Sequence, residues 1–324
     1  MKALVTGATG FVGGHLVDVL RERGDDVTAL VRSAERGAKL AAKGVRLVQG
    51  DLHAMDALRR ASAGQDVVYH VAGVVAARNE AEYLTGNRDG TANLLRATEA
   101  TGSASRFVLV SSMAAGGPSR QGRPRQPDDT PNPVTAYGRS KLAGETVVRG
   151  GGLPWVILRP PTVYGPNDKD NLIKVYRLAR LGVAPVFGDG SQELSAVFVT
   201  DLARAIAAAG VKPDVVRKLY YINHPEIFTS ADLVHRIAES MGRKVRVIGL
   251  PGPVVRGILH LTGASALVLH RSTILNADKA NEFLQPAWTA DPSAFMAEAG
   301  WVAEHDLTSG LAETWRWYRD AGWL

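Results

Sequence analysis

A tyrosine and a lysine stand four positions apart in the stretch VTAYGRSKLAGE, residues 134–145. Four residues of α-helix correspond to about 400° of rotation and roughly 6 Å of rise, so Tyr137 and Lys141 would lie on one helical face, one turn apart. A free phenol titrates near ~10, and an ammonium about 4 Å away stabilises the phenolate by about 4 kcal/mol at an effective dielectric of about 20. The spacing is therefore typical of a proton-transferring tyrosine, although a packed tyrosine beside a solvated lysine has the same spacing.

Three glycines follow the first apolar run of the chain in VTGATGFVGGHL, at Gly7, Gly10 and Gly13. They stand between a predicted strand and a predicted helix, the context in which such a triad binds a dinucleotide. The glycines permit a tight turn and a close approach of a pyrophosphate to backbone N–H groups, and the helix dipole favours the negative charge. This pattern predicts a dinucleotide cofactor.

The end of the second predicted strand, TALVRSAER, bears on which dinucleotide is bound. An acidic residue at that point accepts hydrogen bonds from the ribose 2′-hydroxyl of NAD(H). This chain has no acid there and places Arg32 beside Ser33. A guanidinium pairs with a 2′-phosphate through two hydrogen bonds, so the sequence favours NADP(H). NAD(H) stays the alternative, because Arg32 stacked on the adenine would suit either cofactor.

Short β-branched or apolar runs alternate with helical stretches through the first half of the chain, which is typical of βαβ units around a parallel sheet. The predicted strands cover Lys2–Thr6, Val27–Val31, Val45–Val48, Val67–Ala72, Phe107–Ser111 and Trp155–Leu158. The predicted helices cover Phe11–Arg23, Met55–Ala61, Glu80–Ala100 and Ala136–Arg149. Six strands with helical crossovers predict an α/β fold with a doubly wound parallel sheet of the Rossmann type.

The composition changes after Pro160, where proline and glycine become frequent. We expect a dinucleotide-binding domain over residues 1–164, to which parts of 195–225 contribute, and a smaller C-terminal α/β region over 165–324 that mainly binds substrate. In this second region a strand is expected in LYYIN, and Thr229 and Asp232 are spaced for a capping box at the start of a helix.

Composition excludes several classes of site and partner. The 324 residues include no cysteine, which excludes disulfides, thiolate zinc sites and a cysteine nucleophile, and no histidine pair has metal-site spacing. The net charge is +6, but Lys and Arg are spread along the chain, so no nucleic-acid partner is expected. No apolar run approaches the ~20 residues of a membrane span, and the start does not resemble a signal peptide, so a cytoplasmic protein is expected.

Several further stretches combine with the glycine triad and the tyrosine–lysine pair. In chain order they read TGATGFVG, GDL, DVVYHVAG, NRDGTANLL, VLVSSMAAGG, YGRSK, LRPPTVYGP and VFVTDLARAI. With them the chain resembles, over almost its whole length, the extended short-chain dehydrogenase/reductase family. That group includes nucleotide-sugar epimerases, 3β-hydroxysteroid dehydrogenases and dihydroflavonol reductases.

The resemblance implies a role for each matching residue. Tyr137 would be the catalytic acid/base, and Lys141 its partner on the nicotinamide ribose. Ser112 would orient the substrate oxygen, with Ser111 as the competing assignment, and Asn87 would hold a water beside the lysine. With Tyr137 and Lys141, the cofactor would contact Gly7, Thr9, Gly10, Phe11, Val12, Gly13, Arg32, Asp51, Leu52, Val71, Ala72, Gly73, Ser111, Pro160, Thr162 and Val163. No metal is required.

Departures from the family pattern reduce the number of family reactions that we expect of this chain. The stretch SSMAAGG lacks the acidic pair that dehydratases of the family usually carry after the catalytic serine. In GSQELSAVFV, Leu194 and Ser195 replace the arginine and the acid common in sugar epimerases, although Lys174, Arg177 or Arg180 would be alternative diphosphate ligands. Met113 and Gly116 replace residues that often point toward a sugar, and the stretch 254–269 is apolar enough to cover a hydrophobic ligand.

We therefore expect an NAD(P)-dependent oxidoreductase that transfers hydride between nicotinamide and a ketone or secondary alcohol without a diphosphate. A nucleotide-sugar epimerase with tightly bound NAD and a non-catalytic cofactor-sensing protein are the alternatives. Family members commonly dimerise through two long helices per subunit, here residues 80–100 and 136–149, so a homodimer is expected, with a monomer as the alternative.

Overall fold

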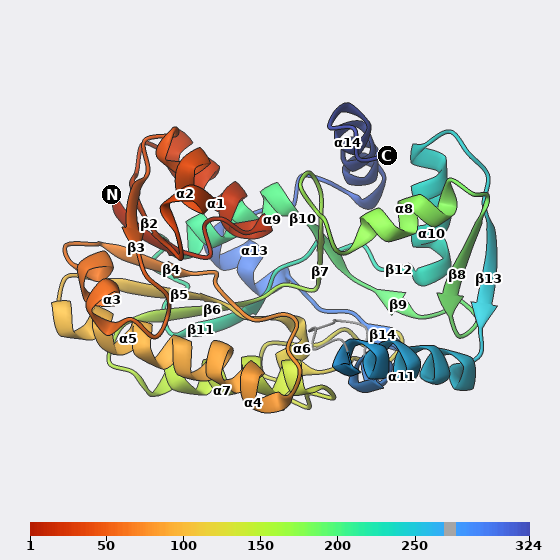
Figure 1. Cartoon of the computed structure of the whole chain (residues 1–324), viewed down its shortest axis with the longest axis horizontal. Helices are drawn as coiled ribbons and strands as arrows, with labels where there is room; N and C mark the ends of the chain where they lie inside the picture. The colour runs from red at the N-terminus through yellow and green to blue at the C-terminus, as the bar shows by residue number, and fades with distance from the viewer. Residues whose placement is uncertain (269–276) are drawn as a thin grey trace.

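The core of the molecule is a seven-stranded parallel sheet in the order β11-β6-β5-β4-β1-β2-β3 (Figure 1). The computed structural model describes residues 1–268 and 277–324. The strands of this sheet are β1 (Lys2–Thr6), β2 (Asp26–Val31), β3 (Arg46–Gln49), β4 (Val67–His70), β5 (Arg106–Val110), β6 (Trp155–Arg159) and β11 (Lys218–Tyr221). The strand order reverses between β1 and β4, so the sheet is doubly wound and of the Rossmann type, as predicted.

Helices cover both faces of the sheet, because successive residues of each strand point to opposite sides. On one side Val5 and Val108 pack with side chains of α1 and α9. On the other side Leu4 and Leu109 pack with side chains of α3, α5 and α7. These helices are α1 (Phe11–Glu22), α3 (Met55–Ser62), α5 (Gly90–Thr101), α7 (Ala136–Gly150) and α9 (Val199–Ala209). The three layers form the cofactor-binding architecture that the alternating sequence pattern predicted.

The structure corrects the number of strands in this sheet. The sequence predicted six, and β11 is a seventh, formed by the stretch LYYIN and paired with β6 through Leu219 and Ile157. The sequence predicts this strand, and it lies within residues 195–225, parts of which are expected to contribute to the dinucleotide-binding domain. Local sequence shows that a strand forms but not which sheet it joins.

The helix predicted over Glu80–Ala100 is also corrected. It consists of α4 (Glu80–Leu84), the π-helical turn η1 (Thr85–Asp89) and α5. In addition, α2 (Ala34–Ala41) was not predicted, because leucine is the only large apolar residue in its stretch AERGAKLA. Ser33 caps α2 by accepting a hydrogen bond from the Arg36 backbone N–H at 3.3 Å, which compensates for the weak apolar pattern.

The second region consists of short strand pairs and helices. Its strands are β7 (Thr162–Tyr164) with β10 (Ala196–Phe198), β8 (Val183–Phe187) with β13 (Arg246–Leu250), and β9 (Glu193–Leu194) between β12 (Phe228–Thr229) and β14 (Ala287–Trp288). Its helices are α8 (Leu172–Ala179), α10 (Ser230–Ser240), α11 (Gly252–Val268), η2 (Ala277–Lys279), α12 (Ala280–Phe283), α13 (Ser293–Ala299) and α14 (Leu307–Asp320). The capping box predicted for Thr229 and Asp232 is present at the start of α10. The apolar stretch 254–269 is part of α11, except Leu269, which lies outside the described residues.

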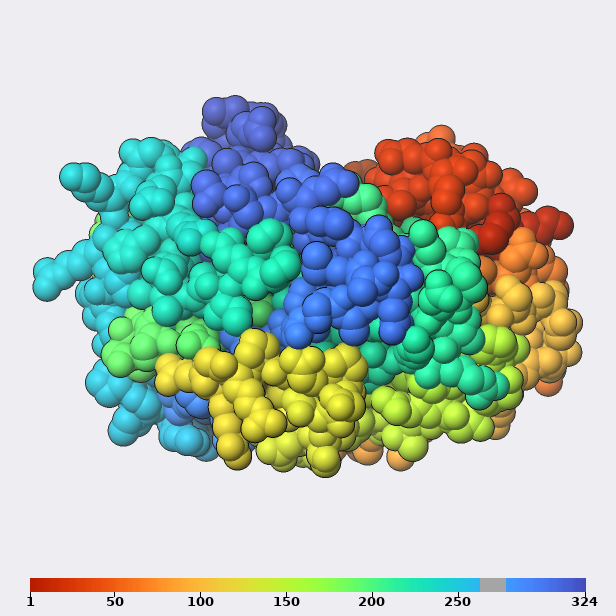
Figure 2. All heavy atoms as spheres, turned by 180° about the vertical axis from the view of Figure 1, so that it is seen from behind, coloured from red at the N-terminus to blue at the C-terminus, as the bar shows by residue number. Residues whose placement is uncertain are grey.

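The chain passes between the two regions more than once. Seen from behind, the blue C-terminal part lies in the middle of the molecule, between the cyan second region and the red start of the chain (Figure 2). In the core, Phe295 of α13 and the nearby Trp301 belong to the same apolar cluster as β1 and α1. None of the helices in the described part of the chain is long and apolar enough to cross a membrane.

Candidate active site

The predicted site residues gather at the carboxyl edge of the sheet. The glycine turn follows β1, Arg32 follows β2, Asp51 follows β3 and Gly73 follows β4, while Ser111 and Ser112 follow β5. Because all seven strands are parallel, these strand ends share one edge, at which open α/β sheets bind their ligands. The arrangement brings segments far apart in sequence to one place.

The glycine turn has the shape that a pyrophosphate requires. Gly7 has a φ of 74°, and a Cβ built there would stand 2.7 Å from the Ala72 backbone nitrogen. A Cβ on Gly13 would stand 2.1 Å from the Gly7 carbonyl oxygen, so α1 packs directly on the turn. Gly10 begins α1 without a side-chain cap, and no acidic residue occupies its first turn. The backbone N–H groups and the helix dipole of this turn therefore suit an anionic group.

The neighbouring predicted contacts line the same turn. Thr9 is exposed, and Phe11 and Val12 are half-buried at the start of α1. The Phe11 ring meets His15 edge-on at 5.9 Å between centroids, and His15 Nε2 lies 2.9 Å from the Pro166 carbonyl oxygen. The start of α1 is thus tied to the segment just after β7, and in β7 itself the predicted contacts Thr162 and Val163 are exposed and half-buried. Pro160, before them, is buried, and its carbonyl accepts from the Met113 N–H at 2.9 Å.

Arg32 is exposed at the end of β2. In the described part of the chain its guanidinium has no hydrogen-bond or ion-pair partner, whereas the Ser33 oxygen beside it is used as the cap of α2. The arginine therefore stays available for an external anion next to the glycine turn.

Asp51 and Leu52 have structural partners of their own. The Asp51 Oδ1 accepts hydrogen bonds from the backbone of His53 at 2.8 Å and of Ala54 at 3.1 Å, which shapes the turn into α3. Leu52 packs so closely on Gly90 that a Cβ there would lie 2.9 Å from its Cδ1. Both residues lie at the carboxyl edge, as the sequence predicted, but the turn already uses one Asp51 oxygen.

Tyr137 faces Ser112, and Ser111 turns away from both. Ser112 caps the short helix α6 (Met113–Gly116) by accepting from the Ala114 N–H at 3.2 Å, and its hydroxyl lies close enough to the Tyr137 phenol to lower the phenol pKa. Ser111 Oγ instead donates to Glu145 Oε1 at 2.5 Å in a buried position. A Cβ on Gly138, beside the tyrosine, would stand 2.4 Å from the Ala114 carbonyl oxygen, so a glycine is needed for α7 to approach α6. Of the two serines, Ser112 is the one in contact with the tyrosine.

Lys141 lies beneath the loop after β4. Its Nζ donates to the Val110 carbonyl at 2.8 Å, and a Cβ on Gly73 would stand 3.5 Å from the same atom. Val71 and Ala72 are half-buried in that loop, and Gly73 is exposed above the lysine. Burial lowers the pKa of Lys141 to about 8, while the charge of Glu145 opposes the shift. The lysine thus faces the surface on which the resemblance places the cofactor.

The tyrosine pKa moves in the direction opposite to the one we expected from the helical spacing. Burial raises the pKa of Tyr137 to about 12, and the hydrogen bond with Ser112 opposes this rise. The Lys141 ammonium was expected to lower it, but its hydrogen bond goes to the carbonyl of Val110. In the chain by itself Tyr137 is therefore a protonated phenol at neutral pH.

Asn87 forms the centre of the π-helical turn. Its Nδ2 donates to the Val74 carbonyl at 3.0 Å and to Ser140 Oγ at 2.9 Å, and its Oδ1 accepts from the Val74 N–H at 2.8 Å. A Cβ on Gly144 would stand 2.6 Å from the Asn87 carbonyl oxygen. The residue predicted to hold a water beside the lysine thus ties α7 to the loop that covers Lys141.

A buried histidine that sequence reasoning did not assign connects these parts. His70 Nδ1 lies 2.7 Å from Thr6 Oγ1, and its Nε2 lies 2.9 Å from Thr91 Oγ1. Thr91 in turn donates to the Asn87 carbonyl at 2.6 Å. Burial lowers the pKa of His70 to about 3, so the ring is neutral and orients its neighbours. The only sequence signal for this role is a histidine at the end of a central strand.

A buried ion pair packs beneath α7, the helix that carries Tyr137 and Lys141. Arg159 donates through Nε and Nη2 to the two Glu145 carboxylate oxygens at 2.9 and 2.7 Å, and through Nη1 to the Tyr221 hydroxyl at 3.0 Å. Arg159 is 1% exposed and Glu145 is fully buried. A Cβ on Gly116 would stand 2.1 Å from the Tyr221 oxygen, so this position, where family members often carry a residue that points toward a sugar, is here packed against the network. It joins α7 to β6 and β11.

Leu194 and Ser195 place no charged group at the positions where sugar epimerases commonly carry an arginine and an acid. Leu194 is half-buried and packs in the aromatic cluster of the second region, and Ser195 is 1% exposed and accepts from the Ala290 N–H at 3.3 Å. The alternative cations Lys174, Arg177 and Arg180 are exposed on and after α8. Asp278 of η2 accepts a hydrogen bond from the Ala136 N–H at 2.7 Å, so η2 contacts the start of α7.

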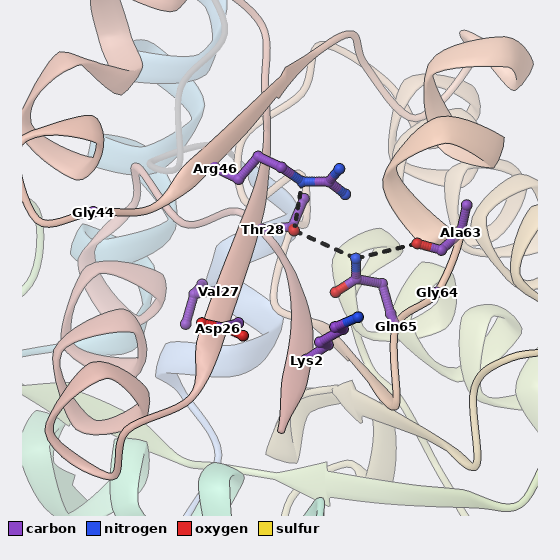
Figure 3. A pocket seen from close by; sticks show the side chains of 9 residues that line it. All are labelled: Lys2, Asp26, Val27, Thr28, Gly44, Arg46, Ala63, Gly64 and Gln65. Atoms are coloured by element: carbon purple, nitrogen blue, oxygen red, sulfur yellow. Dashed lines mark hydrogen bonds between the residues drawn. The ribbon is translucent and has the colours of Figure 1, made fainter.

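A cleft of about 360 Å³ lies elsewhere (Figure 3). It is lined by Lys2, Asp26, Arg46 and Gln65, which stand at or just before the starts of β1 to β4. The amino ends of parallel strands lie opposite their carboxyl ends, so this cleft is remote from the glycine turn. No group of three metal-binding side chains occurs among the residues that the structure describes.

The chain belongs to the NAD-dependent epimerase/dehydratase family, whose model matches residues 3–223. A ceramide reductase of Caulobacter vibrioides is 34% identical over 320 residues, covering 99% of this chain and 95% of the relative. The 4-hydroxy-2-methyl-3-oxo-4-farnesyl-3,4-dihydroquinoline-1-oxide ketoreductase of Stigmatella aurantiaca is 28% identical and covers 88% of this chain and 91% of its own. MoeE5, solved in complex with UDP-glucuronic acid and NAD, superposes with a TM-score of 0.77 at 26% identity over 99% of this chain and 100% of its own.

The comparisons establish the extended short-chain dehydrogenase/reductase fold that the motifs indicated. The family is described as NAD-dependent, one similar structure was solved with NAD, and one relative is named a ketoreductase.

Proposed function

We propose that this chain reduces a ketone on a largely apolar substrate with NADPH, and oxidises the corresponding secondary alcohol in reverse. The observation that carries the proposal is the contact of Ser112 with the Tyr137 phenol, one helical turn from the buried Lys141. The names of a ceramide reductase and a ketoreductase among the relatives support it.

The residues at the carboxyl edge fit a dinucleotide. The turn at Gly7 and Gly13 leaves no room for a Cβ, and Arg32 stands free beside it for a 2′-phosphate. The cofactor, when bound, supplies the hydride. We assign its binding to residues 1–164 together with α9 and β11, and substrate binding mainly to 165–324.

The chain's own residues supply the proton and the orientation. Because its pKa is raised to about 12, Tyr137 is protonated at neutral pH and can donate to the oxygen of a ketone. Ser112 hydrogen-bonds the phenol and would hold the same substrate oxygen, and the positive charge of Lys141 would stabilise the phenolate left after donation. Ser111 serves the Glu145 network instead.

The proposed substrate class follows from position 194. A leucine cannot neutralise a diphosphate, and Leu194 packs with aromatic side chains. A substrate without a diphosphate suits this surface.

The homodimer and the cytoplasmic location expected from the sequence stay predictions.

An epimerase with tightly bound NAD is the second candidate, favoured by the likeness to MoeE5. It would interconvert a nucleotide sugar with no net change in nicotinamide absorbance. A screen of ketones with NADPH and NADH, followed by absorbance, distinguishes the two. Loss of absorbance with apolar ketones supports reduction; interconversion of a UDP-sugar without such loss contradicts it.

A further inference from the structure

One end of the molecule carries an apolar surface on which β8, β13 and α11 lie together, remote from β3 (Figure 1). We call it the β13–α11 face and define it by its exposed apolar residues. These are Val183, Pro185, Ile248, Val254, Ile258 and Leu261. Exposed fractions reach 48% at Val254 and at Ile258 and 74% at Leu261.

The pattern of α11 is unusual for a helix at a water-exposed surface. Val255 and Leu259 are buried and pack with Ala280 of α12, as the inner face of such a helix should. Val254, Ile258 and Leu261 follow the spacing of an outer stripe, where polar residues are the norm. The neighbouring β8–β13 pair adds exposed apolar residues of its own, since Pro185 and Ile248 are register partners and both are exposed.

The charged residues that β13 and α11 carry are basic, while the exposed Asp189, after β8, lies beside Gly249 of β13. The sequence has no Asp or Glu between Glu239 and Asp278. Within that stretch Arg243, Lys244, Arg246 and Arg256 are exposed. Exposed apolar side chains ringed by basic ones are the composition of a surface that inserts shallowly into lipid headgroups and is attracted to anionic lipids.

We propose that the β13–α11 face docks on the surface of an anionic lipid bilayer. The inner side of α11 packs on Ala280 of α12. Asp278, in the turn η2 that directly precedes α12, accepts a hydrogen bond from the backbone N–H of Ala136, next to Tyr137. Docking would therefore place the membrane one helical layer from the catalytic tyrosine. The proposal rests on the surface alone, and its measurement needs no turnover.

The test is flotation of the purified full chain with vesicles of equal parts phosphatidylcholine and phosphatidylglycerol, and with vesicles of phosphatidylcholine alone. The wild type is expected to float with the anionic vesicles and to be released by salt. Ile258→Glu and Leu261→Glu should weaken binding by about tenfold or more, since each puts a carboxylate into the contact. Arg256→Glu should weaken it by about fivefold or more.

Two matched controls lie outside this face. Val302→Glu adds the same charge at an apolar position that is 60% exposed, and Arg60→Glu reverses an exposed charge on α3. Both should bind as the wild type does, with thermal unfolding showing that every variant is folded. Failure of the wild type to float with anionic vesicles, or equal binding by Ile258→Glu, would overturn the proposal.

Self-association is the competing occupant of this face. Sedimentation without lipid would reveal it, and a wild-type oligomer that Ile258→Glu dissociates would assign the face to a second copy of the chain and overturn bilayer docking. Ile248→Glu, which lies on β13 outside the stretch 254–269, should also weaken flotation and should keep the wild-type rate on a water-soluble ketone. Loss of flotation with retained turnover thus separates this proposal from the proposed function.

Discussion

Tyr137 combines a raised pKa with a position at the carboxyl edge of the sheet. A buried phenol of this kind is a proton donor rather than a base until a positive charge approaches it. Lys141 is the nearby source of such a charge, and its own pKa of about 8 means that it loses its proton near the upper limit of neutral conditions. At neutral pH a protonated Tyr137 and a charged Lys141 are the states that the proposed reduction uses.

Tyr137→Phe is expected to remove this proton donor. Turnover should fall by about 10²–10⁴-fold, the usual contribution of a general acid, while the affinity for NADPH changes little. Steady-state oxidation of NADPH gives the rate, and a fluorescence titration gives the affinity. A variant that keeps the wild-type rate would remove Tyr137 from the mechanism.

Arg32→Asp is expected to move cofactor preference from NADPH toward NADH. The change replaces a group that pairs with a 2′-phosphate by one that repels it and accepts from a 2′-hydroxyl. The ratio of kcat/KM for the two cofactors measures the preference, and Arg60→Asp, on the exposed side of α3, is the control. An unchanged ratio in Arg32→Asp would refute the 2′-phosphate assignment.

At the scale of elements, α7 is held in place by buried polar groups on two sides. Asn87 and Ser140 join it to the π-helical turn, and Glu145 and Arg159 join it to β6. Glu145 also carries charge toward Lys141 and opposes the lowering of the lysine pKa. The helix that carries Tyr137 and Lys141 is thus positioned by hydrogen bonds as well as by apolar packing.

Glu145→Gln is expected to destabilise the fold by about 3 kcal/mol or more, because it leaves the buried Arg159 without its counter-charge. Glu80→Gln breaks the exposed ion pair between Glu80 of α4 and Arg139 of α7, the helix that also carries Glu145. This substitution should cost at most about 1 kcal/mol. Urea unfolding measures both. Equal effects of the two substitutions would show that burial does not strengthen the Glu145 pair.

His70 predicts a pH dependence of stability. Its pKa is about 3 in the fold and ~6.5 in an unfolded chain, so between these values the unfolded chain binds a proton that the fold excludes. Stability that is present above about pH 6.5 is therefore lost as the pH falls through this window. His70→Gln does not titrate, so its free energy of unfolding should fall less than that of the wild type between about pH 6.5 and 4. Parallel pH profiles of the two proteins would contradict the neutral, buried histidine.

Elements differed in how far the sequence determined them. The β-branched runs predicted the first six strands within a few residues, because buried parallel strands require such runs. The helix over 80–100 hid its π-helical turn, since a single turn of five residues is too short to be recognised from the apolar pattern. The Glu145–Arg159 pair was also hidden, because a buried charge and an exposed one look alike in sequence.

At the scale of the whole molecule, the fold brings the strand ends of the first half and the segment after α11 to one place. The motifs predicted which residues meet at the carboxyl edge, but not that Ser111 and Ser112 point to different partners. That distinction depends on β6 and β11, which place Arg159 and Tyr221 beside Glu145. It is a tertiary property, and local spacing does not contain it.

The most direct test of the account is one reaction mixture in which the protein meets NADPH and either a long-chain apolar ketone or UDP-glucose, with nicotinamide absorbance and products followed together. The account predicts that NADPH is consumed in equal amount to the alcohol formed, and that UDP-glucose is unchanged. Interconversion of UDP-glucose without net loss of absorbance, and no oxidation of NADPH by any ketone, would contradict it.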